Sequence, residues 1–553
     1  MKQYLLVFIC CLQLSLHASS QDKTLSVDVS WYDGGKRFFV LSSEEQMMGL
    51  SDLVAKGNDF SGKTISLSRD VDLSRGVWQP IGNPSAPFSG VFDGGLSNVV
   101  LGEMASGTTG GLFGYVVDGT IKNVSVSITS TLHDIQTFGA VAGYIDNKSI
   151  IENCSHVQPL TILGAFVVGG IVGSSDGYVN GCSNRGDIEN IKSNSSTMGG
   201  IVGTGTGIVE NSSNKAKLMG ATVCGGIMGK SRKNGEVTQL NNCHNEGEIS
   251  ARSEKDNPAF KIFAGGIGGE LINVEMMECH NKGKVTAYSY KDNSNSSVIT
   301  ACAGGLIGVG AGKFSASYNV GNVASRSVVN VPSTQDGSTK NDAGGIVGYN
   351  TAEGITEMEF CYNAGSIFVF GQAPKGTFLN YGGLVGGFEN FMPKLTGCYS
   401  VEGCCAQSAG DVGFNVPVLS NMEIVVPAET MRSNDFLQNV PTMITLNDCD
   451  LYLYDSEKNN NGNPVLKKVI SEMPLKDAEG GVTLQGASEL SGKKYFHYWI
   501  TGLEQFKVDV LADEQFKYHL GKLDVGEHNF QAYVVTPQGE TIRGELVKFS
   551  VNK

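Results

Sequence analysis

The sequence predicts an all-β protein in which a right-handed parallel β-helix is followed by a small C-terminal β-sandwich. Three observations lead to this fold class. Glycine is unusually frequent, with 73 residues against 14 prolines, a short glycine motif recurs through the middle of the chain, and this motif stops well before the C-terminus. At 553 residues the chain is also too long for one compact domain, so we expect two or more units.

The recurring motif is Gly-Gly-Ile/Leu-Val/Phe-Gly, which occurs nine times when one degenerate copy is counted. The copies start at Gly110, Gly139 (degenerate), Gly169, Gly199, Gly225, Gly265, Gly304, Gly344 and Gly382. Successive starts are 29, 30, 30, 26, 40, 39, 40 and 38 residues apart. A period in this range over so many copies indicates a solenoid, in which each repeat stacks on the next.

The repeats have the composition of strands. They are rich in valine, isoleucine and threonine, alternate with period two, and are interrupted by glycine and asparagine. Glycine and asparagine accept the left-handed backbone that tight corners require, which favours coils of short strands. Nine coils at strand spacing would form a rod of roughly 40–45 Å.

A second pattern follows each glycine motif, and it assigns residues to faces. Its first position is Cys154, Cys182, Ser212, Cys243, Cys279, Ser317, Cys361 or Cys398. If these small side chains face the core, they form an interior ladder of thiols, and stacking alone does not create disulfide geometry. An asparagine column two residues later is expected at a turn, its amides bonded along the stack: Asn184, Asn214, Asn245, Asn281, Asn319 and Asn363.

The residue directly after the cysteine column is expected to face solvent, because neighbouring strand residues point to opposite sides. Along the stack it changes from Ser155, Ser183 and Ser213 to His244, His280, Tyr318, Tyr362 and Tyr399. These last five residues are the candidate ligand-binding site, since an exposed aromatic row can stack on sugar rings or apolar ligands. The alternative is that the rings stack on one another and only stabilise the sheet.

Length variation is concentrated at one corner of the coil. The gap between the glycine motif and the cysteine column is steady, whereas the extra residues fall at about 250–263, 286–302, 324–342 and 368–381. They are expected to project as loops or hairpins on one side of the rod. Loops on a rigid scaffold often carry binding function, although tolerated drift in length explains them equally well.

The two ends of the repeat region differ from its middle. Ser43 to Ala55 begins with a capping-box pattern and has helical spacing, which predicts a helix covering the open N-terminal end. After about Pro474 the motif disappears and alternating strands predict a β-sandwich, with an immunoglobulin-like fold as one expectation. The expected divisions are a signal peptide (1–20), an N-terminal segment with the helical cap (21–57), the β-helix (58–415), its closing segment (416–470) and the C-terminal sandwich (471–553).

The first twenty residues have the pattern of a secretory signal. Lys2 supplies the positive start, residues 4–16 the apolar core, and Ala18-Ser19-Ser20 the small residues for cleavage. The alternative is a lipoprotein anchored through Cys10 or Cys11, which the bulky preceding residues disfavour. No later segment is long and apolar enough to span a bilayer. We therefore expect an exported protein, secreted or held at the cell surface.

The glycine units resemble the GLUG-motif repeats of bacterial surface proteins, which also occur in the non-catalytic part of IgA-cleaving metallopeptidases. Lead-in residues 57–73, 78–82 and 88–94, and closing residues 429–440 and 461–466, are similar to the corresponding segments of that family. The resemblance covers roughly residues 35–467. It implies a β-helix and an adhesin-like role, and it is specific for architecture rather than for a ligand.

The sequence favours no catalytic, metal or cofactor site. The net charge is −14 and no basic cluster could neutralise phosphates, which argues against nucleic acid. Cys243-His244 and Cys279-His280 are neighbours whose side chains point apart, so they do not predict zinc binding. No His-Glu-x-x-His is present, and Cys224 to Ser231 lacks the first glycine of a phosphate loop.

The expected function is therefore binding: a monomeric, adhesin-like surface or secreted protein whose partner is an extracellular glycan or a host or matrix protein. One alternative is an architectural spacer that displays the C-terminal domain. Another is a β-helix polysaccharide lyase or hydrolase, in which carboxylates such as Asp93 would meet residues of the next coil.

Overall fold

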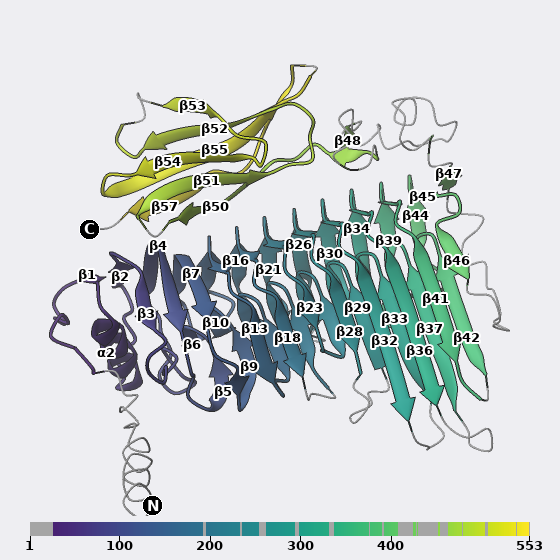
Figure 1. The fold of residues 1–553 in the computed structure, drawn as a ribbon, viewed down its shortest axis with the longest axis horizontal. Helices are drawn as coiled ribbons and strands as arrows, with labels where there is room; N and C mark the ends of the chain where they lie inside the picture. Colours follow the sequence, from purple (N-terminus) through teal and green to yellow (C-terminus); the bar gives the residue numbers. More distant parts are fainter. Residues whose placement is uncertain are drawn as a thin grey trace, which may run out of the picture.

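The computed structural model shows an all-β rod with a separate sandwich lying along its flank (Figure 1). The fold class is thus the predicted one, a parallel β-helix followed by a small β-sandwich. The structure describes residues 26–191, 195–232, 235–253, 261–292, 298–330, 337–374, 376–389, 392–407, 424–426, 429, 452–453, 460, 463–477, 479–503, 507–537 and 539–551. The expected signal peptide and most of the expected closing segment lie outside these residues.

Parallel strands from successive coils form the walls of the rod. A sheet of 29 strands runs from β1 (Phe38–Leu41) to β47 (Ile424–Val426). A nine-stranded sheet contains β8 (Leu132–His133), β13 (Leu160–Leu163), β18 (Ile188–Ile191), β23 (Leu218–Met219), β28 (Ile249–Arg252), β32 (Val285–Asp292), β36 (Val323–Asn330), β41 (Ile367–Gln372) and β46 (Cys405–Gln407). The other contains β5 (Gly107–Gly110), β9 (Ile135–Gly139), β14 (Val167–Gly169), β19 (Thr197–Gly199), β24 (Val223–Gly225), β29 (Lys261–Gly265), β33 (Val298–Gly304), β37 (Ser338–Gly344) and β42 (Thr377–Gly382).

The motif glycines allow close approach between coils. From Gly139 to Gly382 the first glycines pair directly from coil to coil. A Cβ on Gly226, a second motif glycine, would lie 2.0 Å from the carbonyl oxygen of Gly266 and 2.6 Å from Cγ of Asn245. Any larger residue there would push the coils apart.

The left-handed corners lie just before the cysteine column. Asn153, Asn211 and Asn242 have φ of 51°, 49° and 51°, and the equivalent Gly181 has φ of 63°. The next residue is buried, and its side chain donates to the carbonyl two positions back: Cys243 Sγ lies 3.3 Å from Asn241 O. The serines of this column make the same bond, which explains why they can replace cysteine. The six cysteines of this column are free thiols.

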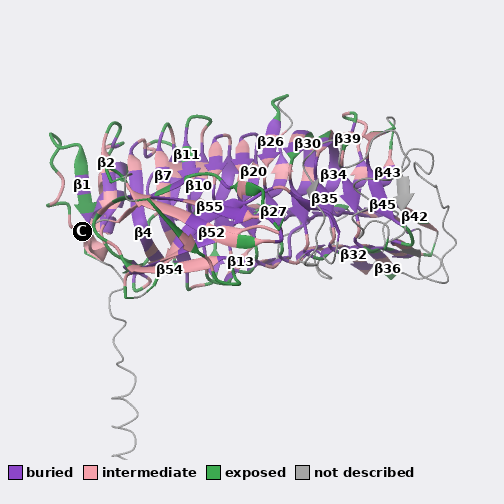
Figure 2. Cartoon of the chain, turned by 90° about the horizontal axis from the view of Figure 1, so that it is seen from above, coloured by how far each residue is buried: buried purple, intermediate pink, exposed green. Residues whose placement is uncertain are grey.

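The asparagine column forms a continuous internal ladder, as predicted. Asn184 Nδ2 donates to Asn214 Oδ1 at 2.8 Å, and the same bond repeats through Asn245, Asn281, Asn319 and Asn363 at 2.7–2.8 Å. All six asparagines are fully buried. Each amide is thus satisfied inside the rod, and the ladder ties six coils together. Buried residues follow the rod as an almost continuous band (Figure 2).

The predicted N-terminal cap is present as α2 (Glu44–Ala55). Ser43 is its N-cap: the Gln46 backbone N–H donates to Ser43 Oγ at 3.3 Å, and the Ser42 N–H donates to Gln46 Oε1 at 2.7 Å. Met47, Leu50 and Val54 of this helix are buried in the same core as the first coils. The helix therefore closes the end of the rod.

Many of the extra residues of the later coils that the structure describes form strands. β32, β36 and β41 on one side, and β33, β37 and β42 on the other, continue past the shorter strands of the earlier coils (Figure 1). We call this two-layered extension the fin. Its interior includes polar side chains, since the Ser327 hydroxyl donates to Asn341 Oδ1 at 2.7 Å and both are fully buried. The expected projection on one side is thus present as an extension of two sheets.

The C-terminal unit is a sandwich of two antiparallel sheets. One contains β50 (Ile470–Lys476), β51 (Gly481–Ala487) and β54 (Lys517–Lys522). The other contains β52 (Lys493–Ile500), β53 (Val508–Leu511), β55 (Gly526–Val535), β56 (Thr541–Arg543) and β57 (Val547–Val551). Phe496, Phe516 and Phe530 lie in its core. No helix within the described ranges is long and apolar enough to cross a membrane.

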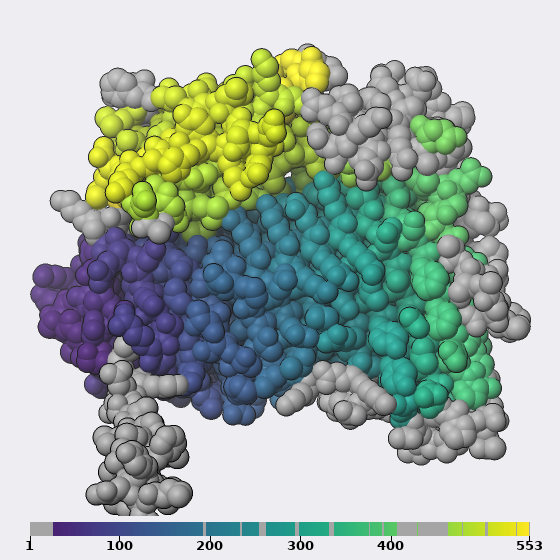
Figure 3. All heavy atoms as spheres, in the orientation of Figure 1, coloured from purple at the N-terminus to yellow at the C-terminus, as the bar shows by residue number. Residues whose placement is uncertain are grey.

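The chain folds back so that the sandwich packs along the N-terminal half of the rod (Figure 3). Strands β50 and β57 contact β4 (Val91–Leu101). At a register shift in β4, Leu96 has φ of 62° and joins the hydrophobic core of the sandwich, where it is 3% exposed. An apolar side chain of the rod is therefore part of the sandwich core.

Candidate functional site

The five predicted ligand-binding residues stand in one row. Their register is direct from coil to coil. The rings of His244 and His280 are 5.2 Å apart and 3° from parallel, His280 and Tyr318 are 4.9 Å apart, and Tyr318 and Tyr362 are 4.8 Å apart. We call this set, which ends at Tyr399, the ring column. The stacking that the sequence offered as the structural alternative is present.

The expectation that the ring column is exposed is wrong. The residues of the column alternate with buried cysteines and asparagines, so their side chains leave the core as predicted, yet His244 is 2% exposed, His280 4% and the three tyrosines 0%. The reason is the returning C-terminal part of the chain. Tyr362 OH donates to Pro464 O and accepts a bond from Asn460 Nδ2 at 3.1 Å. The C-terminal part of the chain therefore packs against the ring column.

Charged contacts hold the sandwich beside the column. Glu472 is 6% exposed and lies between Lys215 Nζ at 2.8 Å and Arg185 Nη2 at 3.4 Å. Burial opposes ionisation of Glu472, but the ammonium of Lys215 and the guanidinium of Arg185 outweigh it and lower its pKa. This carboxylate is therefore charged and paired across the contact.

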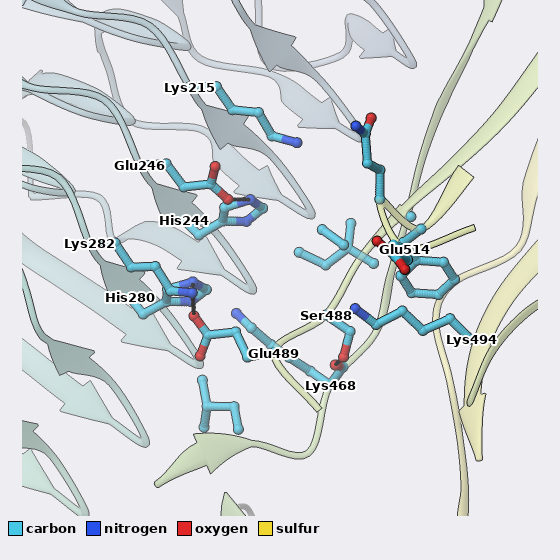
Figure 4. Close-up of a pocket in the computed structure, with 16 residues that line it drawn as sticks. Lys215, His244, Glu246, His280, Lys282, Lys468, Ser488, Glu489, Lys494 and Glu514 are labelled. Atoms are coloured by element: carbon cyan, nitrogen blue, oxygen red, sulfur yellow. Dashed lines mark hydrogen bonds and ion pairs between the residues drawn. The ribbon is translucent and has the colours of Figure 1, made fainter. Parts of the chain in front are cut away.

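A cavity of about 220 Å³ opens between the ring column and the sandwich (Figure 4). We call it the junction cavity. From the rod come Lys215, His244, Glu246, His280 and Lys282; from the C-terminal part come Leu466, Lys468, Ile470, Gly486, Ala487, Ser488, Glu489, Lys494, Glu514, Gln515 and Phe516. Two of the five predicted site residues, His244 and His280, thus line a cavity, whereas the tyrosines do not.

Burial controls the charges around this cavity. It lowers the pKa of His244 and His280 well below the usual value, and the nearby Lys468 ammonium adds to the effect. Burial also lowers the pKa of Lys468 to about 8 and raises that of Glu489. Near neutral pH both imidazoles are therefore uncharged, and the Lys468 ammonium loses its proton more readily than an exposed lysine would.

A second candidate lies on the outer face of the fin. Arg252, Tyr288, Arg326 and Phe370 pair in direct register on neighbouring strands, and we call them the fin platform. The Arg326 guanidinium lies over the Tyr288 ring at 5.5 Å and over the Phe370 ring at 5.0 Å. Arg326 is exposed and the other three are half-buried. Guanidinium groups and aromatic rings thus alternate along an accessible surface.

The sequence pattern contained a signal for the fin platform that was not used. Tyr288, Arg326 and Phe370 each lie three residues after the Val285, Val323 or Ile367 that marks the repeat. Aligning the coils on that column would have placed the three on one outward face. By contrast, no local pattern marks Lys468 or Glu489 as residues of a cavity, because their neighbours come from distant coils.

The described residues contain no group of three or more histidine, cysteine and acidic side chains that could hold a metal ion. Asp93, considered as one member of a carboxylate pair, accepts a bond from Asn123 Nδ2 at 3.1 Å and lies 3.5 Å from Lys122 Nζ. Its position is explained by these structural contacts. Burial raises the pKa of the Cys154 and Cys361 thiols well above the usual value, which keeps them protonated.

Comparisons with known proteins are sparse. No family model matches the chain, so the resemblance to GLUG repeats stays a prediction. No curated protein matches it either. Among solved structures, similarity is found to one described as that of "a putative immunoglobulin A1 protease from Bacteroides ovatus": it is 15% identical, the match covers 77% of this chain and 91% of that chain, and the TM-score is 0.28. This likeness assigns no activity to the chain.

Proposed function

We propose that the chain is an exported, adhesin-like binding protein and that it binds an extracellular glycan on the fin platform. The observation that carries this proposal is the alternation of Arg326 with the rings of Tyr288 and Phe370. Sugar rings present flat C–H faces that pack on aromatic rings, and their hydroxyl and carboxylate groups accept bonds from guanidinium. A column of both groups suits an extended chain of sugars.

The fin holds these side chains on strands, which keeps their spacing fixed. Arg252 Nη2 lies 2.9 Å from Glu189 Oε1, a residue of an earlier coil, so its guanidinium is oriented. Phe368, two residues before Phe370, is 39% exposed and widens the apolar part of the surface. A pre-organised surface loses little conformational entropy when a ligand binds.

The spacer alternative is less well supported. A spacer would project its terminal domain from the end of the rod, whereas the sandwich lies along the flank and contacts β4. For the lyase or hydrolase alternative, the fin platform offers guanidinium groups and aromatic rings rather than a pair of carboxylates. The assay below separates that alternative from binding, because turnover is measured on the same polysaccharides.

The test is a glycan array, followed by calorimetry on the best polysaccharide, with the native protein and the double variant Tyr288→Ala, Phe370→Ala. We expect the variant to bind at least ten-fold more weakly. Phe378→Ala is the matched control, because Phe378 is 50% exposed on β42, in the other sheet of the fin. Equal binding by the double variant would reject the fin platform, and release of reducing or unsaturated sugar would reject the binding-only function.

Export is tested separately, because it rests on the N-terminal sequence alone. The full-length chain expressed in a Gram-negative host should be found outside the cytoplasm, with its first twenty residues removed. Deleting residues 2–16 should retain the protein in the cytoplasm. Incorporation of a labelled fatty acid would instead identify the lipoprotein alternative, with Cys10 or Cys11 as the anchor.

A further inference from the structure

The junction cavity contains a buried ammonium group, that of Lys468, on which the Glu278 carboxylate acts without forming an ion pair among the described residues. Lys468 is 8% exposed, and its ammonium donates to the backbone carbonyl of Glu278 at 2.6 Å. Within the described part of the chain, no carboxylate lies within 4.0 Å of it. Two other lysines of the cavity do have carboxylate partners: Lys215 is paired with Glu472, and Lys282 with Glu489. A buried cation without a counter-ion is costly, so an anion that enters the cavity would stabilise it.

His244 adds an unused polar group to the same wall. It is 2% exposed, and neither ring nitrogen has a hydrogen-bond partner among the residues that the structure describes. Its Nε2 lies 3.6 Å from Glu246 Oε1, beyond hydrogen-bond distance. A buried nitrogen without a partner carries a desolvation penalty, and a ligand in the cavity would remove it. In Figure 4 the imidazole faces the same space as the Lys468 side chain.

The part of the cavity wall that comes from the sandwich is mixed, because Lys494, Glu514 and Gln515 lie there together with carbon surface. Leu466, Ile470 and Phe516 contribute carbon surface, and Gly486 and Ala487 leave room beside it. The volume of about 220 Å³ is below the usual range for drug-sized ligands, so it suits a molecule of about one ring. The ligand class follows from an ammonium without an ion pair and an imidazole without a hydrogen-bond partner among the described residues, together with carbon surface against which a small body can pack.

We propose that the junction cavity binds a small organic carboxylate, with the acid group held by Lys468 and His244 and the ring body against Phe516. This site is independent of the fin platform. Two sources share this chemistry: a free aromatic or aliphatic acid, and an acidic sugar such as a uronic acid. Because the walls of the cavity come from both units, binding also stabilises the docked arrangement of sandwich and rod.

The proposal is tested by calorimetry on the full chain near neutral pH with four probes: benzoate, glucuronate, glucose and inorganic phosphate. We expect saturable binding of benzoate or glucuronate, and none of glucose. Preference between the two acids identifies the source. Failure of both acids to bind at millimolar concentration would overturn the proposal, as would binding of phosphate alone.

Two variants test the residues. Lys468→Met should weaken binding of the acid at least ten-fold. The melting temperature of the ligand-free protein should stay the same or rise, because the substitution removes a buried charge that has no ion pair in the described part of the chain. If the lysine were purely structural, its loss would lower the melting temperature and leave acid binding unchanged. His244→Phe keeps a ring in the column and should weaken binding several-fold. Lys230→Met is the matched control, since that lysine pairs with Glu270 outside the cavity. Tyr288→Ala, Phe370→Ala should leave acid binding unchanged, which separates this site from the proposed glycan site.

Discussion

Glu472 lies 2.8 Å from Lys215, although 257 positions separate them in the chain. Their contact joins the first strand of the sandwich to the middle of the rod. Because the carboxylate is 6% exposed and has a second partner in Arg185, it ties the C-terminal unit to one place on the β-helix.

The first prediction concerns this contact. Glu472→Gln removes the negative charge and leaves Lys215 and Arg185 without their buried partner, which should cost about 3–5 kcal/mol of docking free energy. Limited proteolysis should then release the sandwich faster, and the denaturant midpoint should fall. Glu248 lies 3.1 Å from Lys217 in an exposed pair, so Glu248→Gln should change the free energy of unfolding by only about 0–1 kcal/mol and leave the midpoint nearly unchanged. Equal effects of both substitutions would contradict the role of Glu472.

Leu96 gives a second prediction for the same interface. Leu96→Ala removes an apolar side chain from the sandwich core and should destabilise docking by about 2–5 kcal/mol. Hydrogen exchange should rise in β50 and β57 but not in the coils. Leu511→Ala is the control, because Leu511 is 57% exposed and should tolerate truncation. Unchanged exchange in both sandwich strands would show that Leu96 is dispensable.

The third prediction concerns pH. Because the pKa of His244 and His280 is lower in the folded protein than the ordinary value near 6.5, the unfolded chain binds more protons below about pH 6.5 and stability falls as the pH decreases. Lys215, Lys282 and Lys468 face these rings and oppose their protonation, whereas Glu246 and Glu489 favour it. The raised pKa of Glu489 works in the opposite direction, because that group takes up its proton more readily in the folded state.

Thermal unfolding between pH 7 and pH 5 measures this dependence. The double variant His244→Phe, His280→Phe should lose less stability over that range than the native protein. His133→Phe, at an exposed histidine, should follow the native curve. Identical slopes for the double variant and the native protein would remove the ring column from the acid response.

The fourth prediction concerns the asparagine ladder. Asn245→Ala removes the ladder bonds of Asn214 Nδ2 and Asn281 Oδ1. Because these two groups keep their bonds to Ala216 O and Gly283 N, each lost bond should cost about 0.5–1.5 kcal/mol. Chemical unfolding of the whole rod is the measurement. Asn330→Ala, at an exposed residue bonded to Asp292, should cost about 0.5 kcal/mol or less.

The fifth prediction concerns the glycine motif. Gly226→Ala places a Cβ 2.0 Å from the Gly266 carbonyl oxygen, so two coils must separate and soluble expression should fall sharply. Gly34→Ala meets nothing closer than 3.9 Å and serves as the control. Native circular dichroism and yield for Gly226→Ala would show that the coils can adjust.

The sequence could predict what depends on neighbouring coils. The repeat placed Cys243 inside and Asn245 on a ladder, and the capping pattern at Ser43 located the N-terminal helix, because each depends on contacts within one or two repeats. The surroundings of His244 were not predictable in this way. Alternation decides which side of a strand a residue faces. The residues that lie over His244, among them Glu489 and Lys468, are more than 200 positions away in the chain.

The fold-back of the C-terminal unit has a consequence for biogenesis. The chain emerges with its N-terminus first, and the coils can stack as soon as each is complete. Until the last segment arrives, a flat row of rings and an unmatched group of lysines remain in contact with water. In a molecule that is truncated or stalled before residue 460, the ring column and the lysines beside it are therefore accessible to chaperones and proteases. In the complete molecule this surface is buried. Burial of the ring column thus distinguishes complete molecules from incomplete ones.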